Sequence, residues 1–382
     1  MSACLGAVAH TYFLYPLWWR VWRKRLPAVV FPKDADTHLP ELTVIIAAYN
    51  EAEFIQQRVS NLLALEYPAE LLQIVIASDG SDDGTELLAE EARREDPRVS
   101  VVRFSERRGK VSVLNDVCSA ATGEILVFSD ANVDFAPDAL THLVKPFLNP
   151  EVACVCGKLC FHSRAGQPHT VSEGFYWRME TWLKELEGAR GVLLGANGAI
   201  YALRRSLWKE CPPDTVVEDF FVPMKLLIEG WKVIFEPKAV AWEDLPPALK
   251  DEFGRRIRIG AGDFQALWRC LPLLHPRFGL AAWVFLSHKV LRWTGPFFLL
   301  GAYVLSIVLT SSGSYVASVL LVLQNAFYGL AVIGLVLPSG TGIMHKFIGL
   351  CTHFTSMNAA LFFGFFRWVR RGQSTAWQRT RR

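Results

Sequence analysis

A long uncharged stretch constrains the fold of this chain more than any other feature of its sequence. Residues 293–344 contain no Asp, Glu, Lys or Arg, and the polar residues 310–314 interrupt them in the manner of a turn. Charge-free apolar segments of this kind are typical of membrane-spanning helices. The outer flanks carry Arg292 and Lys346, and basic residues favour the cytosolic side of a membrane. The pattern predicts a helical hairpin with both ends in the cytosol.

Two further apolar segments extend this membrane part. Residues 2–19 lack Asp, Glu, Lys and Arg and precede a basic cluster, so we expect residues 1–22 to form a spanning helix with a cytosolic carboxyl end. A cleaved signal peptide is the alternative, but Tyr15, Pro16 and Trp18 stand where small cleavage-site residues belong. Polar residues interrupt residues 347–366, and we expect an interfacial or re-entrant segment there. Residues 278–287 could instead cross as part of a longer helix.

The composition agrees with a membrane protein. Of the 382 residues, 51% are hydrophobic and 20% are charged, which is too apolar a balance for an ordinary soluble enzyme. Six arginines and no acid lie in residues 367–382. Such clusters suit the cytosolic rims of membrane helices, so we expect membrane lipids and no nucleic acid as partners. We assign residues 293–366 to a C-terminal transmembrane region and residues 367–382 to a basic cytosolic tail.

The eight cysteines do not have the spacing of a disulfide framework, and we expect reduced thiols. Cys154, Cys156 and Cys160 lie close together in the strand-like sequence VACVCGKLC. Their alternation indicates buried thiols rather than zinc ligands, because a zinc site needs a second pair of ligands.

Three short apolar runs in the remaining part each end in polar residues: residues 42–51, 71–85 and 124–132. Each resembles a buried parallel strand. Helical patterns at residues 53–65, 85–94 and 110–121 follow or intervene, which predicts an α/β domain with a mostly parallel sheet over residues 41–247. We expect amphipathic interfacial helices in residues 248–292, before the membrane region.

The polar residues at the strand ends predict a shared crevice, because ligands of such sheets bind at the carboxyl ends of the strands. Asp130 and Asn132 present two oxygen ligands to a hard cation such as Mg²⁺ or Mn²⁺. Asp79, with Gly80 in a tight loop, is suited to a nucleobase or ribose, and Lys110 to phosphate. An isolated acid at a strand end is more often a helix cap, but several in chain order favour a site.

A second acidic pair, Glu218 and Asp219, precedes another helical pattern. A carboxylate here could act as the general base that takes a proton from an acceptor hydroxyl. The alternative is an N-cap pair favoured by the helix dipole.

These residues together resemble family 2 glycosyltransferases of the GT-A fold, particularly membrane synthases related to hyaluronan, cellulose and poly-N-acetylglucosamine synthases. The resemblance covers nearly the whole chain. It rests on AAYNE at residues 47–51, SDGSDDGT at 78–85, GKVSVLN at 109–115, SDAN at 129–132, GANGAIYALRR at 195–205 and VED at 217–219, followed by a basic amphipathic stretch.

The resemblance implies a role for each matching residue. Asp219 would be the base, and Glu218 would shape its site. Asp130 and Asn132 would hold Mg²⁺ or Mn²⁺, although many relatives have two aspartates there. The donor site would comprise Ala48, Tyr49, Glu51, Asp79, Gly80, Lys110, Asp130, Arg255 and Arg258. The loop beneath the acceptor would comprise Gly195, Asn197 and Gly198; an ordinary turn is the alternative for that loop.

One motif departs from the family pattern. Processive synthases have Gln-x-x-Arg-Trp where this chain has residues 255–259, RRIRI, so the arginine is kept while the tryptophan is replaced by Ile259. Arg255 and Arg258 could offset diphosphate charge or anchor the chain at the interface. The loss of the tryptophan favours limited sugar addition over processive synthesis.

We therefore expect an inverting, membrane-bound glycosyltransferase that moves a sugar from a nucleotide-sugar donor, such as a UDP-sugar, to a lipid-linked or glycan acceptor. A processive synthase that exports its chain, alone, as an oligomer or with an export partner, is the first alternative. A catalytically inactive scaffold is the second. We expect the protein in the inner (plasma) membrane of a bacterium, with the catalytic domain in the cytosol.

Overall fold

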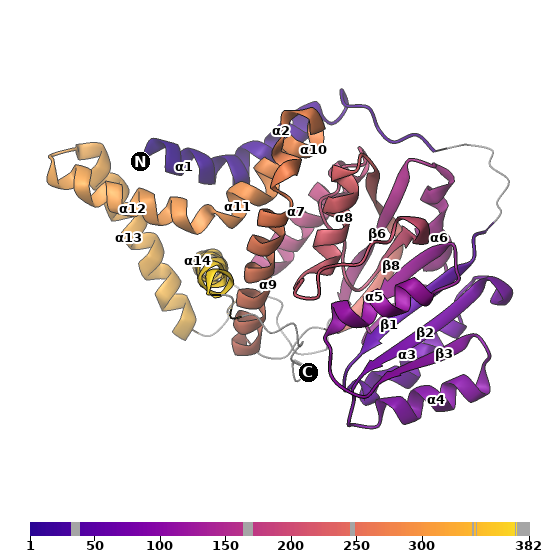
Figure 1. Cartoon of the computed structure of the whole chain (residues 1–382). Helices are drawn as coiled ribbons and strands as arrows, with labels where there is room; N and C mark the ends of the chain where they lie inside the picture. Colours follow the sequence, from indigo (N-terminus) through magenta and orange to yellow (C-terminus); the bar gives the residue numbers. More distant parts are fainter. Residues whose placement is uncertain are drawn as a thin grey trace.

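The computed structural model describes residues 1–31, 39–162, 171–244, 249–337, 340, 342–370 and 372. Figure 1 shows a domain built around a β-sheet beside a group of helices that comes from both ends of the sequence. The strands and helices of the sheet domain lie within residues 42–244.

The sheet joins strands in the order β3-β2-β1-β4-β7-β6-β8-β5. The strand bounds are β1 Leu42–Ala48, β2 Leu72–Asp79, β3 Val99–Phe104, β4 Ile125–Ser129, β5 Val133–Phe135, β6 Val152–His162, β7 Tyr201–Arg204 and β8 Lys232–Asp244. Parallel pairing joins β1 to β2 and β4, β2 to β3, and β6 to β8. Antiparallel pairs of β7 with β4 and β6, and of β5 with β8, make the sheet mixed.

Helices cover both faces of this sheet, and the central strands alternate between two hydrophobic cores. In β1, Ile45 packs into one core and Val44 and Ile46 into the other, and the whole strand is buried. Such continuous burial is typical of a parallel strand with both faces covered. Helices α3 (Ala52–Leu63), α4 (Thr85–Glu95) and α6 (Ala139–Val144) contribute to the second core, while α5 (Lys110–Ala120), α7 (Val171–Gly188) and α8 (Glu218–Ile228) contribute to the first.

The remaining helices form the membrane part. Helix α9 (Leu249–Arg269) lies between the sheet domain and α14 (Ile343–Val369) in Figure 1, and it packs against α14. Helices α12 (Gly295–Ser311) and α13 (Tyr315–Val336) join at residues 312–314, where the polar turn is predicted. By length and composition α13 and α14 can each cross a membrane. The pair Leu280–Trp293 and Gly295–Ser311 passes the same test together, with a bend of 58°.

Two membrane predictions are refined by these helices. Of residues 278–287, those from Leu280 onward join a longer helical run, through α10 (Leu280–Val284), a π-helical turn at Phe285–Val290 and α11 (Leu291–Trp293). We expect an interfacial or re-entrant segment at residues 347–366. These residues lie in one continuous helix, α14, which lacks the break of a re-entrant segment, and the interfacial expectation stays a prediction. The polar residues of α14 did not break the helix: Thr352 and Asn358 donate to backbone carbonyls one turn earlier. Most of the predicted basic tail lies outside the described residues.

The N-terminal segment, which we expect to span the membrane, is helical over residues 2–22 in three pieces; among the described residues it is not one of the helices long and apolar enough to cross a membrane. Helix α1 (Ser2–Ala9) leads through a π-helical turn at His10–Leu14 into α2 (Tyr15–Trp22). Helix α1 packs on α12, whereas Tyr15 and Trp19 of α2 are fully buried in the core of the sheet domain. The segment therefore connects the helices of the membrane part to the sheet domain.

Candidate active site

The loops that follow β1 and β2 are tied together at the edge of the sheet. Asn50 has a positive φ of 56°. Its side chain forms two hydrogen bonds with Asp82: Nδ2 donates to Asp82 Oδ1 at 2.7 Å, and Oδ1 accepts from the Asp82 backbone amide at 2.9 Å. The Glu51 amide donates to Thr85 Oγ1 at 2.8 Å. These contacts fix the AAYNE segment beside the loop after β2.

Asp79 organises the approach to α5. Its Oδ1 accepts the Arg108 amide at 2.6 Å, and its Oδ2 accepts the Gly109 amide at 2.8 Å. Gly109 has a φ of 89°, which favours glycine and lets the chain turn into the helix. Asp79 therefore places Lys110, the first residue of α5. A carboxylate can accept about four hydrogen bonds, so acceptor capacity remains for a ligand.

Lys110 joins the two acidic motifs. Its Nζ lies 3.1 Å from Asp130 Oδ1, at the end of β4, and 2.9 Å from Glu218 Oε1, at the start of α8. Burial lowers the pKa of Lys110, but the carboxylates of Asp130, Glu218 and Asp219 outweigh burial and raise that pKa above its usual value. The ammonium is therefore permanently charged.

Asp219 lies one residue further along α8. Its Oδ2 accepts the Gly198 amide at 3.0 Å. Burial, together with repulsion from Glu218, raises the pKa of Asp219 to about 6, although Lys110 and the Gly198 amide lower it. The N-cap alternative for the acidic pair is wrong in detail, because the cap residue is Val217 and no side chain caps α8. A carboxylate with a pKa near neutrality is suited to accept a proton.

The predicted acceptor loop lies directly against Asp219. A Cβ at Gly195 would lie 2.3 Å from the Phe220 ring, so glycine there permits close packing with the protein itself. Asn197 Nδ2 donates to the Gly157 carbonyl at 3.0 Å, and Asn197 Oδ1 accepts from Lys184 Nζ at 2.5 Å. The loop forms a turn at residues 197–200, and these bonds hold that turn beside Asp219.

Comparison with known proteins identifies the domain. Residues 43–210 match the family model for glycosyl transferase family 2. Residues 43–210 therefore form a domain similar to family 2 glycosyltransferases. The chain is similar to poly-β-1,6-N-acetyl-D-glucosamine synthases from Staphylococcus epidermidis (26% identical over 242 residues) and Staphylococcus aureus strain COL (27% over 244 residues). Each alignment covers 62% of this chain and 58% of the relative, so the transferase spans somewhat more than half the length of these relatives.

Among solved structures, the transferase is similar to the mannosyltransferase PcManGT from Pyrobaculum calidifontis, in complex with GDP-Man and Mn²⁺. The similarity covers 97% of this chain and 99% of that one, with a TM-score of 0.73 and 24% identity. It confirms the predicted GT-A-like fold, including the helices beyond the sheet domain.

Most of the predicted residues of the transferase converge on one site. Asp130, Glu218 and Asp219 surround Lys110, and Arg258 of α9 interacts electrostatically with both Glu218 and Asp219. Burial lowers the pKa of Arg258, as does the neighbouring Arg255, and the two carboxylates oppose this shift. Ala48 is fully buried in β1 and cannot present a side chain to a ligand.

Two residues of the site were not predicted. The Arg107 guanidinium stacks on the Tyr49 ring, 3.7 Å from its centroid, and its Nε and Nη2 have no hydrogen-bond partner within the described residues. The basic run RRGK before α5 was the available signal. Lys184, which contacts Asn197, gave no signal, because it lies in a helix far from every motif.

The metal prediction can be tested against the donor atoms. Asn132 Nδ2 donates to Glu243 Oε1 at 3.0 Å, which fixes the amide with its donor end on Glu243. Among the described residues no group of three His, Cys, Asp or Glu side chains could hold a metal alone. Asp130 and Asn132 therefore fit a hard cation that takes its other ligands from a bound diphosphate.

Proposed function

We propose that this chain is a membrane-bound, inverting glycosyltransferase that moves a sugar from a nucleotide-sugar donor, a UDP-sugar, to a lipid-linked or polysaccharide acceptor. The observation that carries the proposal is the Lys110 ammonium bridging Asp130 and Glu218, with Asp219 beside them. This arrangement combines a cation for a diphosphate with a carboxylate that can accept a proton. Its catalytic face lies in the cytosol of a bacterial cell, at the inner membrane.

Transfer is a single displacement. The acceptor hydroxyl oxygen forms a bond to the anomeric carbon as the bond from that carbon to the diphosphate oxygen breaks, and the diphosphate leaves with the electron pair. Asp219 takes the hydroxyl proton. With a pKa of about 6, Asp219 is mostly deprotonated at neutral pH and ready to do so.

The leaving diphosphate is stabilised by fixed positive charge. Lys110 lies nearest to Asp130, and Arg258, with Arg255 beside it, approaches from α9. Mg²⁺ or Mn²⁺ held by Asp130 and Asn132 would neutralise diphosphate oxygens when bound. Tyr49, Glu51, Asp79 and Gly80 hold the nucleoside in this proposal. Arg107 joins them, because its stacked guanidinium has donors left for a ligand.

The membrane part determines which acceptors can reach the site. Helix α9 brings Arg258 to the carboxylates and packs on α14, so the site faces the membrane helices. Limited addition to a lipid-linked acceptor is the first candidate, because Ile259 replaces the stacking tryptophan. Similarity to poly-β-1,6-N-acetyl-D-glucosamine synthases favours a second candidate, processive synthesis with export by an oligomer or a partner.

A panel assay tests the proposal. Membranes that contain the protein are incubated with radiolabelled nucleotide sugars and Mn²⁺ or Mg²⁺, and organic extraction separates glycolipid from polymer. We expect label in the organic phase with one UDP-sugar, and none with Asp219→Asn membranes. Label in high-molecular-mass polymer would favour the processive candidate. Neither transfer nor donor hydrolysis with any nucleotide sugar, in protein shown to be folded, would refute the proposal and restore the inactive scaffold.

A further inference from the structure

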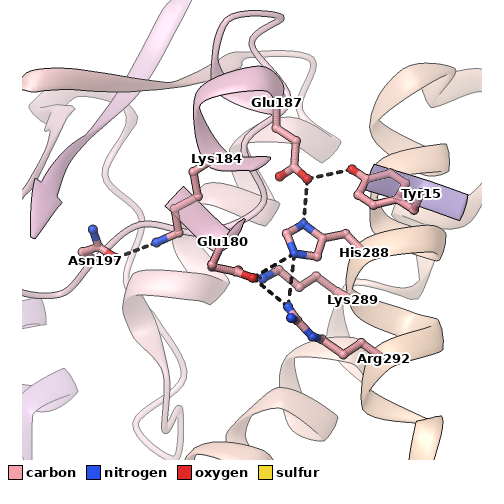
Figure 2. A network of polar contacts seen from close by, with 8 residues as sticks. All are labelled: Tyr15, Glu180, Lys184, Glu187, Asn197, His288, Lys289 and Arg292. Carbon is pink, nitrogen blue, oxygen red and sulfur yellow. Dashed lines mark hydrogen bonds and ion pairs between the residues drawn. The ribbon is translucent and has the colours of Figure 1, made fainter. Parts of the chain in front are cut away.

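Helix α7 carries three charged side chains on the face that lies between the catalytic loop and the membrane part. Glu180, Lys184 and Glu187 are spaced i, i+4 and i+7, so they lie along one side of the helix. Figure 2 shows them pointing in two directions: Lys184 toward Asn197, and the two glutamates toward residues of the membrane part.

The two glutamates fix α7 to the segment before α12. Glu187 Oε1 accepts the Tyr15 hydroxyl at 2.6 Å and lies 2.6 Å from His288 Nδ1. Glu180 lies 2.8 Å from Arg292 Nη1 and 2.9 Å from Lys289 Nζ (Figure 2). Glu187, Glu180 and His288 are buried. Burial raises the pKa of Glu180, but Lys289, Arg292 and His288 outweigh it and hold that pKa well below its usual range, so Glu180 stays charged.

Lys184, unlike the two glutamates, points toward Asn197 rather than toward the membrane part (Figure 2). Among the described residues no carboxylate forms an ion pair with its ammonium, which instead donates to Asn197 Oδ1 at 2.5 Å. A hydrogen bond from a charged donor is roughly twice as strong as a neutral one. The cavity that this pair lines has a volume of about 10 Å³, room for a single water. The contact that the structure gives the ammonium is therefore with the protein itself, at Asn197.

Asn197 in turn connects Lys184 to the base. Its backbone amide donates to Cys156 Sγ at 3.2 Å, and its side-chain Nδ2 donates to the Gly157 carbonyl. The side-chain Oδ1 accepts from Lys184. The next amide along the chain, that of Gly198, donates to Asp219 Oδ2. A shift of Asn197 thus displaces the one backbone donor that orients the Asp219 carboxylate.

We propose that Lys184 is a positioning residue for transfer: by holding Asn197 it keeps the 195–198 loop in place and the Gly198 amide aimed at Asp219. Helix α7 supplies the rigidity, because its glutamates are bound to the membrane part. The proposal rests on the assignment of Asp219 as the base. It adds a residue that never touches the donor, the acceptor or the reacting atoms.

The test compares Lys184→Met, which keeps the aliphatic stem, with Lys184→Arg, which keeps a charged donor. Glu185→Gln, on the exposed side of the same helix, is the matched control. Full-length proteins in detergent are assayed by hydrogen exchange of the peptide that covers residues 195–198, and by kcat and KM with the nucleotide sugar that gives turnover in the panel assay. Equal melting temperatures establish that the variants fold.

For Lys184→Met we expect the hydrogen-exchange rate of residues 195–198 to rise about tenfold. We expect kcat to fall about tenfold, because small misplacements of reacting groups are costly. The donor KM should stay within about twofold of the original value, and Lys184→Arg should recover most of both effects. If Lys184→Met does not fold, Asn197→Ala removes the same contact from the loop side.

Two outcomes overturn the proposal. In the first, Lys184→Met has the same exchange rate at residues 195–198 and the same kcat as Glu185→Gln. In the second, Lys184→Met has a lower kcat but an unchanged exchange rate. Absence of turnover in the unmodified protein counts against the proposed function alone. The exchange comparison then still decides whether Lys184 holds the loop.

Discussion

The Lys110 ammonium lies 2.9 Å from the Glu218 carboxylate, so the first residues of α5 and α8 meet across the site. A cation at the start of a helix is opposed by the helix dipole, whereas an acid there is favoured. Glu218 and Asp130 offset the cost of placing Lys110, and Lys110 in turn lowers the pKa of the neighbouring Asp219.

Lys110→Met should therefore impair both donor binding and the base. We expect kcat/KM to fall by about a hundredfold or more, because a diphosphate counter-charge is lost and Lys110 no longer lowers the pKa of Asp219. Lys110→Arg should retain part of the activity. Steady-state kinetics on the three proteins measure this, and a Lys110→Met variant with unchanged kcat/KM would contradict the role.

Asp219→Asn should remove proton transfer and leave the donor site in place. We expect kcat to fall by about 10²- to 10⁴-fold, which is the usual contribution of a general base. The dissociation constant of the nucleoside diphosphate, measured by calorimetry, should be nearly unchanged. Glu229→Gln, at the far end of the same helix, should keep full activity; retained turnover in Asp219→Asn would refute the assignment.

The pH dependence of transfer should follow Asp219. The base works only when deprotonated, and its pKa is about 6, so kcat/KM should fall about tenfold per pH unit below about 6 and level off above it. Burial disfavours the charged form, so the ionisation of Asp219 costs stability as pH rises from its unfolded pKa to about 6. Asp219→Asn should therefore melt at a higher temperature at pH 7. A flat rate profile down to pH 5 would exclude Asp219 as the base.

Metal dependence should respond to Asn132. Removing its oxygen in Asn132→Ala should raise the concentration of Mn²⁺ needed for half-maximal binding by about tenfold or more, measured by electron paramagnetic resonance in the presence of UDP. Asn132→Asp adds a charge and should tighten binding, since carboxylates suit hard cations. Equal Mn²⁺ binding in all three proteins would place the cation elsewhere.

The sequence predicted those parts of the fold that depend on local patterns. The runs at β1, β2 and β4 are mostly apolar and are followed by or end in Asn50, Asp79 and Asp130, so they predicted parallel strands and a shared crevice. Strand β3 was missed because its residues, Val99–Phe104, are only partly buried at the sheet edge. Strand β7 was missed because its four residues form a strand only by pairing with β4 and β6.

The site residues also divide into those that local sequence patterns predicted and those that depend on tertiary packing. Lys110, Asp130 and Asp219 belong to motifs with a chemical rationale in the sequence. Lys184 does not, because a lysine between glutamates on a helix is typical of a solvated surface. Its contact with Asn197 depends on how α7 packs against the sheet, and no local pattern contains that information. The stacking of Arg107 on Tyr49 joins two separate loops and was equally inaccessible.

The burial of Tyr15 and Trp19 has a practical consequence for producing this enzyme. A truncation that deletes residues 1–22 to obtain a water-soluble catalytic fragment would remove two aromatic side chains from the core of that fragment and leave Glu187 without its phenol donor. Such a fragment is expected to aggregate on expression. Purification should therefore retain the N-terminal helix and extract the whole chain in a mild surfactant or nanodisc.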